Sequence, residues 1–392
     1  LISSFNYTIR VSGSYSNSYG NTIVNMGYII NEALSDSFVF HVDNTVTEGD
    51  GSKENPFPSV DTVLRLVKDT VTDDYKDVLI YLSDGNYPKL DIHNTTQSIR
   101  IIGAENTNIL VDCELSSNAE LHLCSLKFNG AAINNRGNLF VENCIFTDAK
   151  VNAIHSKYGN LTVSNCVFTN NGEADYPFNR ITYPISSMDI FNLGGAIKNE
   201  YGDLIISNSR FTANNAVFGG AVYNNQGNLY IFDSEFKDNK AFSNFNTLAP
   251  ESLGGAVYQY LGDEIIVSNT TFEGNLANGH GGAFYSSGSR PRAVRLSEVT
   301  TAYTPYWMEE YLYLENSPQK IYFVNSNFAK NMAPNGGGAV YITDNLLTQY
   351  ISCNFDGNIA YSHDWFNIMG ISRTWTDSYS DYSQSLDRKS VV

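Results

Sequence analysis

Two short motifs recur along this 392-residue chain, and their spacing constrains its fold more than any other feature. One is an Ala that usually follows a Gly pair, and the other is Phe-x-x-Asn. The alanines are Ala132, Ala153, Ala196, Ala221, Ala256, Ala283 and Ala339, and the phenylalanines that follow them are Phe146, Phe168, Phe211, Phe236, Phe272, Phe328 and Phe355. Six of the seven Ala-to-Phe spacings are 14 to 16 residues, and only the spacing from Ala283 to Phe328 is longer, at 45. A short structural unit is therefore repeated along most of the chain.

One unit, Gly219 to Asn239, contains three short apolar segments separated by Gly and Asn. The alternation in its segment Leu229 to Phe232 is typical of a half-buried strand. If such units stack about 4.8 Å apart, like side chains lie on like, and the small residues two before each Phe face the core. The pattern predicts an all-β fold, a parallel β-helix with three short strands per coil. We expect the right-handed form because strand crossovers favour that hand.

Asn residues recur at fixed positions on both sides of the Phe column. Three residues before each Phe stand Asn143, Asn165, Asn208, Asp233, Asn269, Asn325 and Ser352, and three residues after six of them stand Asn171, Asn214, Asn239, Asn275, Asn331 and Asn358. Asn tolerates left-handed backbone angles and can hydrogen-bond turn groups through its amide, so we expect these residues at corners between strands. Stacked amides can also hydrogen-bond to one another along the axis of the rod.

Four regions follow from the extent of the repeat. Residues 1–40 form an N-terminal strand-rich segment or flap, and residues 41–75 form an initial strand, an acidic loop and a helix that caps the open end of the rod. Ser59 is a good N-cap for that helix, and its apolar face comprises Val60, Val63, Leu64, Val67 and Val71. The β-helix occupies residues 76–358, with insertions at 172–193, 240–253 and 287–318. Residues 359–392 form a C-terminal tail, cap or linker.

Composition disfavours several classes of partner. The net charge of −17 disfavours binding to nucleic acid. The longest apolar runs are too short to span a bilayer, so the chain is not expected to be membrane-spanning. No signal peptide is visible and the first residue is Leu1, so we expect a processed or excised piece.

Cysteines and glycosylation sequons bear on the compartment. The five cysteines, Cys113, Cys124, Cys144, Cys166 and Cys353, form no C-x-x-C pair, and with six His in the chain a zinc site is not expected. Cys144 and Cys166 share one column in adjacent coils, which is compatible with a disulfide or with two stacked thiols. The sequons at Asn6, Asn94, Asn160 and Asn269 are candidate glycosylation sites and favour an extracellular location.

These motifs carry a family resemblance. Gly-Gly-Ala-[Ile/Val/Phe], as at Gly194–Ile197 and Gly281–Phe284, combined with Phe-x-x-Asn, resembles the repeat of the chlamydial polymorphic outer-membrane proteins and of the adhesin-like surface proteins of methanogenic archaea. The stretch Gly49–Phe57, GDGSKENPF, resembles the start of many pectin-lyase-like β-helices. The resemblance covers about residues 40 to 358, although Val151 and Asn152 replace one Gly pair. It implies an adhesin-like protein of the cell surface.

No catalytic residue, metal site or cofactor is expected. A lyase of this fold would need clustered carboxylates and an Arg or Lys base on one sheet face, and a hydrolase would need two carboxylates in a groove. The sequence aligns no such set, although a pair formed by the insertions stays open.

The best candidate for recognition is the insertion 287–318, because Tyr and Trp on a loop supply large contact faces. The predicted binding residues are Tyr303, Tyr306, Trp307, Tyr311 and Tyr313. The predicted function is that of an extracellular adhesin-like rod that binds a cell-surface glycan or protein. Two alternatives stay open: a self-assembling structural subunit of a filament or sheath, and a polysaccharide lyase or hydrolase.

Overall fold

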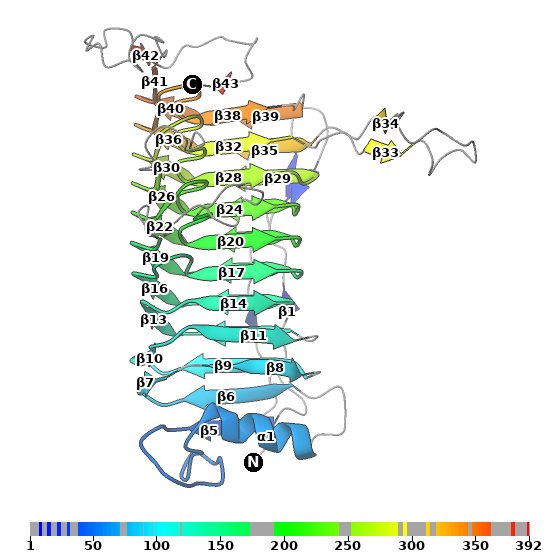
Figure 1. The fold of residues 1–392 in the computed structure, drawn as a ribbon, viewed down its shortest axis with the longest axis vertical. Helices are drawn as coiled ribbons and strands as arrows, with labels where there is room; N and C mark the ends of the chain where they lie inside the picture. Colours follow the sequence, from blue (N-terminus) through cyan, green and yellow to red (C-terminus); the bar gives the residue numbers. More distant parts are fainter. Residues whose placement is uncertain are drawn as a thin grey trace, which may run out of the picture.

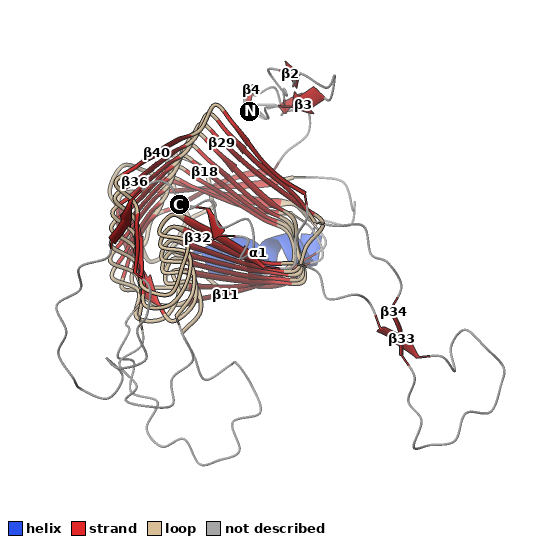
Figure 2. Cartoon of the chain, turned by 90° about the horizontal axis from the view of Figure 1, so that it is seen from above, coloured by secondary structure: helices blue, strands red, loops and turns tan. Residues whose placement is uncertain are grey.

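The chain folds into a long rod of stacked coils. The computed structural model describes residues 38–70, 77–172, 192–242, 252–288, 319–343 and 347–361, apart from residues 89, 96, 118 and 119, together with short strands outside these ranges. In the coils from β6 to β41, successive strands of the rod lie in different sheets, and each pairs in parallel with its equivalent in the next coil (Figure 1). The molecule is a right-handed parallel β-helix, as the repeat predicted (Figure 2).

Three long sheets form the sides of the rod, and every pairing among the strands named here is parallel. Sheet 1 contains β5 (Phe38–Val42), β6 (Val78–Leu82), β9 (Ile99–Gly103), β12 (Leu121–Cys124), β15 (Leu139–Glu142), β18 (Leu161–Ser164), β21 (Leu204–Ser207), β25 (Leu229–Phe232), β29 (Glu264–Ser268), β35 (Lys320–Val324) and β39 (Leu347–Ile351). Sheet 2 contains β7 (Gly85–Tyr87), β10 (Thr107–Ile109), β13 (Lys127–Asn129), β16 (Ile145–Thr147), β19 (Val167–Thr169), β22 (Arg210–Thr212), β26 (Glu235–Lys237), β30 (Thr271–Glu273), β36 (Asn327–Ala329) and β40 (Asn354–Asp356). Sheet 3 contains β8 (Ile92–Thr95), β11 (Cys113–Ser117), β14 (Ile133–Arg136), β17 (Ile154–Lys157), β20 (Ile197–Glu200), β24 (Val222–Asn225), β28 (Val257–Tyr260), β32 (Phe284–Ser287) and β38 (Val340–Thr343).

A fourth, shorter sheet corrects the prediction of three strands per coil. Sheet 4 contains β23 (Asn215–Ala216), β27 (Lys240–Ala241), β31 (Leu276–Ala277), β37 (Met332–Ala333) and β41 (Ile359–Tyr361). Its alanines Ala241, Ala277 and Ala333 form a small buried cluster. The chain stays extended after each Phe-x-x-Asn because an Ala two residues later is small enough to pack there. The extended motif Phe-x-x-Asn-x-Ala was therefore the missed signal. Strand β27 occupies the first two residues of the predicted insertion 240–253.

The remaining strands pair antiparallel. They are β1 (Thr8–Ile9) with β4 (Ile30–Asn31), β2 (Ser14–Ser16) with β3 (Thr22–Val24), β33 (Ala293–Arg295) with β34 (Tyr311–Tyr313), β42 (Ser378–Ser380) with β41, and β43 (Ser390–Val391) with β38.

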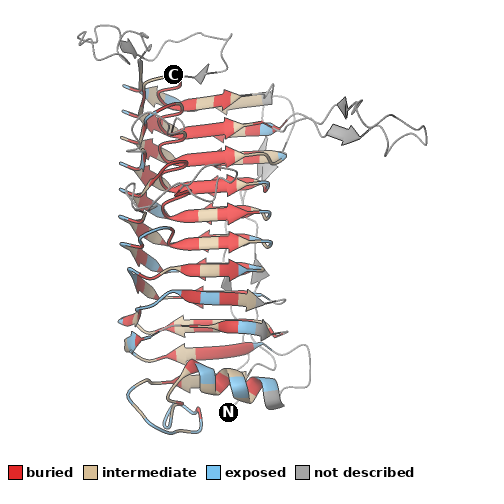
Figure 3. Ribbon diagram, in the orientation of Figure 1, coloured by how far each residue is buried: buried red, intermediate tan, exposed pale blue. Residues whose placement is uncertain are grey.

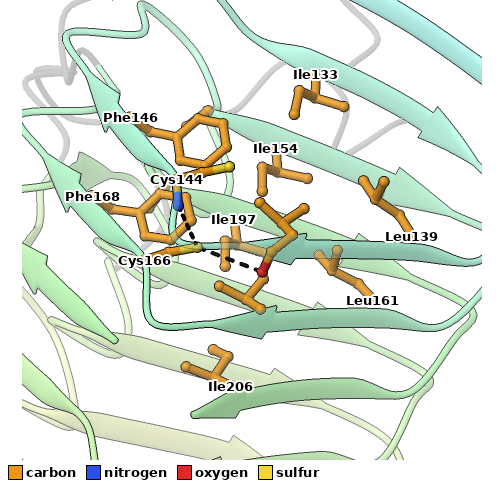
Figure 4. Close-up of a cluster of buried hydrophobic side chains, with 14 of the residues drawn as sticks. Ile133, Leu139, Cys144, Phe146, Ile154, Leu161, Cys166, Phe168, Ile197 and Ile206 are labelled. Atoms are coloured by element: carbon orange, nitrogen blue, oxygen red, sulfur yellow. Dashed lines mark hydrogen bonds between the residues drawn. The ribbon is translucent and has the colours of Figure 1, made fainter. Parts of the chain in front are cut away.

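The Phe column forms the centre of the core, as predicted. Eight rings from Phe128 to Phe355 stack one above another along sheet 2, with successive centroids 4.6 to 4.9 Å apart and planes within 10° of parallel. Beside them, the small column predicted to face the core does so. The backbone N–H of Cys144 donates to Cys166 Sγ at 3.4 Å (Figure 4). In the next coil, the N–H of Cys166 donates to Ser209 Oγ at 3.1 Å. All five cysteines are free thiols, so the stacked-thiol alternative holds for Cys144 and Cys166.

The Asn residues after each Phe form a buried ladder, as predicted. Asn214 is typical: its backbone N–H and its Nδ2 both donate to Asn239 Oδ1, at 3.0 and 2.9 Å, and Nδ2 also donates to the Phe168 carbonyl. The same pattern continues from Asn171 to Asn358, and these side chains are fully buried. Each amide thus satisfies backbone groups of a corner that water cannot reach.

The left-handed backbone predicted for Asn occurs in the column before each Phe. The φ angles of Asn143, Asn165, Asn208, Asp233, Asn269, Asn325 and Ser352 lie between 47° and 54°. In the column after each Phe, the left-handed residue is the one just before the Asn, and it is Ala213 or Lys330 in some coils. Tertiary packing fixes these corners even where the side chain does not favour them.

A helix covers the N-terminal end of the rod, as predicted (Figure 1). It is α1 (Val60–Thr70), and Ser59 caps it by accepting the N–H of Thr62 at 3.3 Å. Val60, Val63 and Val67 are buried in the same hydrophobic cluster as the first coils. The helix therefore shields core side chains that the first coil would otherwise expose.

Candidate binding face

The predicted binding residues lie outside the part of the chain whose side chains are described. Tyr303, Tyr306 and Trp307 fall between β33 and β34, and the backbone of Tyr311 and Tyr313 lies on β34. Their grouping into a contact surface stays a prediction.

Two of the four candidate glycosylation sites are described. Asn160 is exposed and its Oδ1 accepts the backbone N–H of Asp203 at 3.0 Å. Asn269 is exposed and its Nδ2 donates to Asp233 Oδ1 at 3.1 Å. Asn6 and the side chain of Asn94 lie outside the described set.

The outer face of sheet 3 carries side chains that change in type along the rod. Figure 1 shows this sheet face-on. Two columns of outward residues run along it, because alternate residues of each strand point away from the core. The first outer column is Glu114, Asn134, His155, Lys198, Tyr223, Tyr258, Tyr285 and Tyr341. The second outer column is His93, Ser116, Arg136, Lys157, Glu200, Asn225, Tyr260, Ser287 and Thr343.

The upper half of this face, formed by strands β24 to β38, is aromatic and closed. Tyr223, Tyr258 and Tyr285 stack with centroids 5.2 and 5.1 Å apart, and Phe218 packs against Tyr258 at 5.4 Å. With Leu193 they form a second hydrophobic cluster outside the core. Burial raises the pKa of the Tyr258 hydroxyl, so that hydroxyl stays protonated. Figure 3 shows the contrast between these buried strands and the more exposed first strands of the sheet. We take the aromatic half as a packed layer rather than a free surface.

The lower half of the face, formed by strands β8 to β20, is polar and charged. One ion cluster lies at its border with the aromatic half. His155 Nε2 lies 2.8 Å from Glu200 Oε2, and Lys198 Nζ lies 3.3 Å from the same oxygen. The hydrogen bond with His155, reinforced by Lys198, lowers the pKa of Glu200 to about 2 although partial burial opposes the shift. The Glu200 carboxylate is therefore ionised and held in place at any ordinary pH.

A polar groove of about 430 Å³ lies below this cluster. Its outward lining residues are His93, Glu114, Ser116, Asn134, Arg136, His155 and Lys157. Glu114 Oε1 accepts the Nδ2 of Asn134 at 2.8 Å. Arg136 and Lys157 are direct register partners on β14 and β17, and neither has an ion pair with another described residue. The sequence analysis did not predict that Arg136 and Lys157 gather with a carboxylate, Glu114, on one sheet face. The irregular early coils and the insertion before β20 hid the alignment of these residues in the sequence.

An exposed aromatic pair borders the groove. The rings of Tyr158 and Tyr201 stack with centroids 5.3 Å apart, yet the two residues are 62% and 43% exposed. Both follow the last residue of a sheet 3 strand and have left-handed φ angles of 63°, and a Gly follows each. Lys157 Nζ lies 5.0 Å from the first ring centroid and 5.8 Å from the second. The sequence analysis missed this pair, although the recurring Tyr-Gly-[Asn/Asp] at 158–160 and 201–203 was the signal.

Comparison with known proteins agrees with the repeat. Residues 269–287 match the family model described as the Chlamydia polymorphic membrane protein repeat. This stretch contains both Phe272-x-x-Asn275 and Gly281–Phe284, so the resemblance to the chlamydial repeat is confirmed there. No curated protein matches the chain.

Among solved structures, the chain is similar to the pectin methylesterase from Aspergillus niger in deglycosylated form, at 13% identity over 61% of this chain and 78% of that one, with a TM-score of 0.33. A likeness at that TM-score carries no information on activity. Within the described residues, no helix combines the length and the apolar character needed to cross a bilayer. In the same residues, no three His, Cys, Asp or Glu side chains are grouped so that they could hold a metal ion.

Proposed function

We propose that this chain is an extracellular adhesin-like protein of the cell surface, whose β-helix presents binding groups to a glycan or protein partner. The observation that carries the proposal is the division between core and outer face. The core repeats one set of side chains in coil after coil, whereas the lower outer face of sheet 3 carries two cations in register, Arg136 and Lys157, and an exposed aromatic pair. The match of residues 269–287 to a repeat of surface-located chlamydial proteins supports the location.

The state of Glu200 favours binding over catalysis on this face. A general acid or base works best when its pKa lies near the working pH. The pKa of Glu200 is near 2, and two basic side chains hold its Oε2. Such a carboxylate fixes its neighbours in position and is a weak proton acceptor.

The insertion between β32 and β35 is a second proposed contact region. Its five aromatics, Tyr303, Tyr306, Trp307, Tyr311 and Tyr313, are the densest group of Tyr and Trp in any of the three insertions. Rings on an inserted segment would add contact area that a rod of repeated coils does not provide.

The experiment compares attachment and sugar release. The full chain, on beads, is applied to a glycan array and to intact cells, and the release of reducing ends from polysaccharides is measured in parallel. We expect attachment without release. Release of reducing ends would favour the lyase or hydrolase alternative, and attachment only to other copies of the chain would favour the filament subunit.

A shortened variant tests the insertion. Replacing residues 289–318 with a short Gly-containing turn should keep the coils folded, because stability depends only weakly on loop length and Ser287 and Gly288 remain to pair with β38. We expect attachment to fall. The matched control shortens residues 243–251 in the same way and should attach like the wild type. Equal attachment by all three proteins would exclude the insertion as the contact region.

A further inference from the structure

We propose that the lower outer face of sheet 3 binds an acidic polysaccharide, in which one pyranose ring stacks on Tyr158 and a uronic-acid carboxylate is held by Arg136 and Lys157. This inference rests on the proposed binding function and names its ligand class and site. The site comprises Tyr158, Tyr201, Arg136, Lys157 and the groove residues Glu114 and Asn134, and we call it the Tyr158 site.

The first step is the open face of the Tyr158 ring. Tyr158 and Tyr201 occupy equivalent corner positions in adjacent coils, and Gly137 occupies the same position in the coil before them. Backbone hydrogen bonds show this register: the N–H of Gly137 donates to the Lys157 carbonyl, and the N–H of Tyr158 donates to the Glu200 carbonyl. Tyr201 covers one face of the Tyr158 ring. Since Gly137 has no side chain, no residue of this column covers the other face. A ring of this kind, 62% exposed, offers a flat apolar platform for the C–H face of a sugar.

The position of Lys157 leaves that platform free. Its Nζ is nearly equidistant from the two ring centroids, at 5.0 and 5.8 Å, and these rings are 5.3 Å apart. An atom against the open face of Tyr158 would lie much farther from Tyr201. The ammonium therefore lies beside the pair, where it is held by cation–π attraction and can reach a substituent of a stacked ring.

The second step is the pair of cations in register. Arg136 and Lys157 are directly opposite on β14 and β17, and like charges in that arrangement repel. Neither forms an ion pair with another described residue, in a chain whose net charge is −17. The charged side chains other than histidine that line the groove are Arg136, Lys157 and Glu114. A second carboxylate, Glu200, is the register partner of Lys157 on the side away from Arg136, so the space between the two cations holds no acidic register partner. An anion between the two cations would relieve their repulsion, and Arg presents a planar fork that matches a carboxylate.

The third step is the polar groove that continues from these cations. Glu114 and Asn134 line it and are already joined by a 2.8 Å hydrogen bond, so their remaining acceptors and donors point to fixed places. A volume of 430 Å³ accommodates a few sugar units. An apolar platform, paired cations and a hydroxyl-binding groove are together what a uronic-acid chain requires.

The test uses the full chain and two oligosaccharides that share one backbone. A hexamer of β-1,4-linked glucuronic acid and cellohexaose differ only in the group at C6. We expect the wild type to bind the acidic hexamer at least about tenfold more tightly than cellohexaose, since a charge-assisted contact contributes enough for that ratio. We also expect this preference to shrink as salt rises, because the cations are solvent-exposed.

Two double variants locate the site. Tyr158→Ala/Tyr201→Ala should weaken binding of both hexamers, whereas Arg136→Gln/Lys157→Gln should remove the preference for the acidic one. The matched control is Arg210→Gln/Lys237→Gln, which changes two exposed cations on sheet 2 and should bind like the wild type. Circular dichroism and melting temperature should be unchanged in all three, because every altered side chain lies outside the core.

Three outcomes would overturn the inference: equal affinity for the two hexamers, tighter binding of a sulfated cellohexaose than of the uronic-acid hexamer, or unchanged binding in both double variants. The last outcome, in a protein that still attaches to cells, would remove the Tyr158 site and leave the adhesive function standing. A wild type that attaches to no glycan, protein or cell would remove both.

Discussion

The columns inside the rod and the columns on the outer face of sheet 3 follow opposite rules. Inside, equivalent positions keep one residue type: eight stacked Phe, six Asn of one ladder, and a series of Cys, Ser and Thr. Outside, the first outer column passes from Glu114 through Asn134, His155 and Lys198 to four tyrosines. The coil spacing is the same for both, so geometry alone does not cause the difference.

The difference shows which positions of the fold can be substituted at low cost in stability. A core side chain must match the neighbours above and below it and must satisfy buried backbone groups, so a change in one coil disturbs three. An outward side chain in the lower half of the face meets solvent on one side and can change without that cost. Variation on the lower outer face is therefore available for binding, and substitutions inside and outside the rod should differ greatly in their effect on folding.

The largest effect should come from the Phe column. Phe236→Ala leaves a cavity between Phe211 and Phe272 and should cost about 3 to 5 kcal/mol. Because coils couple mainly to their neighbours, hydrogen exchange should speed up around β26 more than at the ends of the rod.

The control for that change lies on the outer face. Tyr158→Ala should cost less than about 1 kcal/mol, because the residue is exposed. If exchange rose uniformly from end to end in Phe236→Ala, or if both changes cost the same, the contrast between core and outer face would fail.

The next effect should come from the buried Asn ladder. Asn239→Ala removes the acceptor for the backbone N–H and Nδ2 of Asn214, and the donor to the Phe211 carbonyl. Because the change leaves buried polar groups without hydrogen-bond partners, it should lower the free energy of unfolding by about 2 to 4 kcal/mol, as measured by chemical denaturation. Asn208→Gly is the matched control: Asn208 is exposed with a φ of 47°, so Gly fits the backbone and should cost about 1 kcal/mol or less. A smaller loss in Asn239→Ala than in Asn208→Gly would show that the ladder amides do not stabilise the corners.

The core was predictable from sequence because its rules are local and repeated. The Phe, Ala and Asn columns could be aligned by eye, and each position needs one residue type for a reason that can be stated in advance. Ser59 and the valines after it indicated the capping helix in the same way. The sequence did not predict features whose residues differ from coil to coil, such as the left-handed corner at Ala213 and Lys330.

The candidate site was hard to predict for the same reason. Arg136, Lys157 and Glu200 come from three coils, and the insertion between β19 and β20 separates the last two in sequence. Residues that share an outer column need not be alike, so no repeated letter marks the column. Only the register of β14, β17 and β20 shows that these charges are neighbours.

The smallest effect should come from the ion cluster on the outer face, and it depends on pH. The pKa of Glu200 is lowered from 4.5 to about 2 in the folded protein, first by the hydrogen bond with His155 and then by Lys198. A carboxyl group with a lowered pKa stabilises the fold above its unfolded pKa, and this contribution is lost as the pH falls toward the folded value. With allowance for solvent screening, the contribution is about 1 to 2 kcal/mol at neutral pH.

Glu200→Gln keeps the shape of the side chain and removes the charge. The difference in unfolding free energy between wild type and Glu200→Gln should therefore shrink as the pH falls from 4.5 toward about 2. Lys237→Gln, which breaks an exposed pair with Glu273, is the control and should change stability by less than about 0.5 kcal/mol. A difference for Glu200→Gln that stays constant down to pH 2 would mean that His155 and Lys198 do not hold the carboxylate, and the border of the charged half would then be as free to vary as the rest of that face.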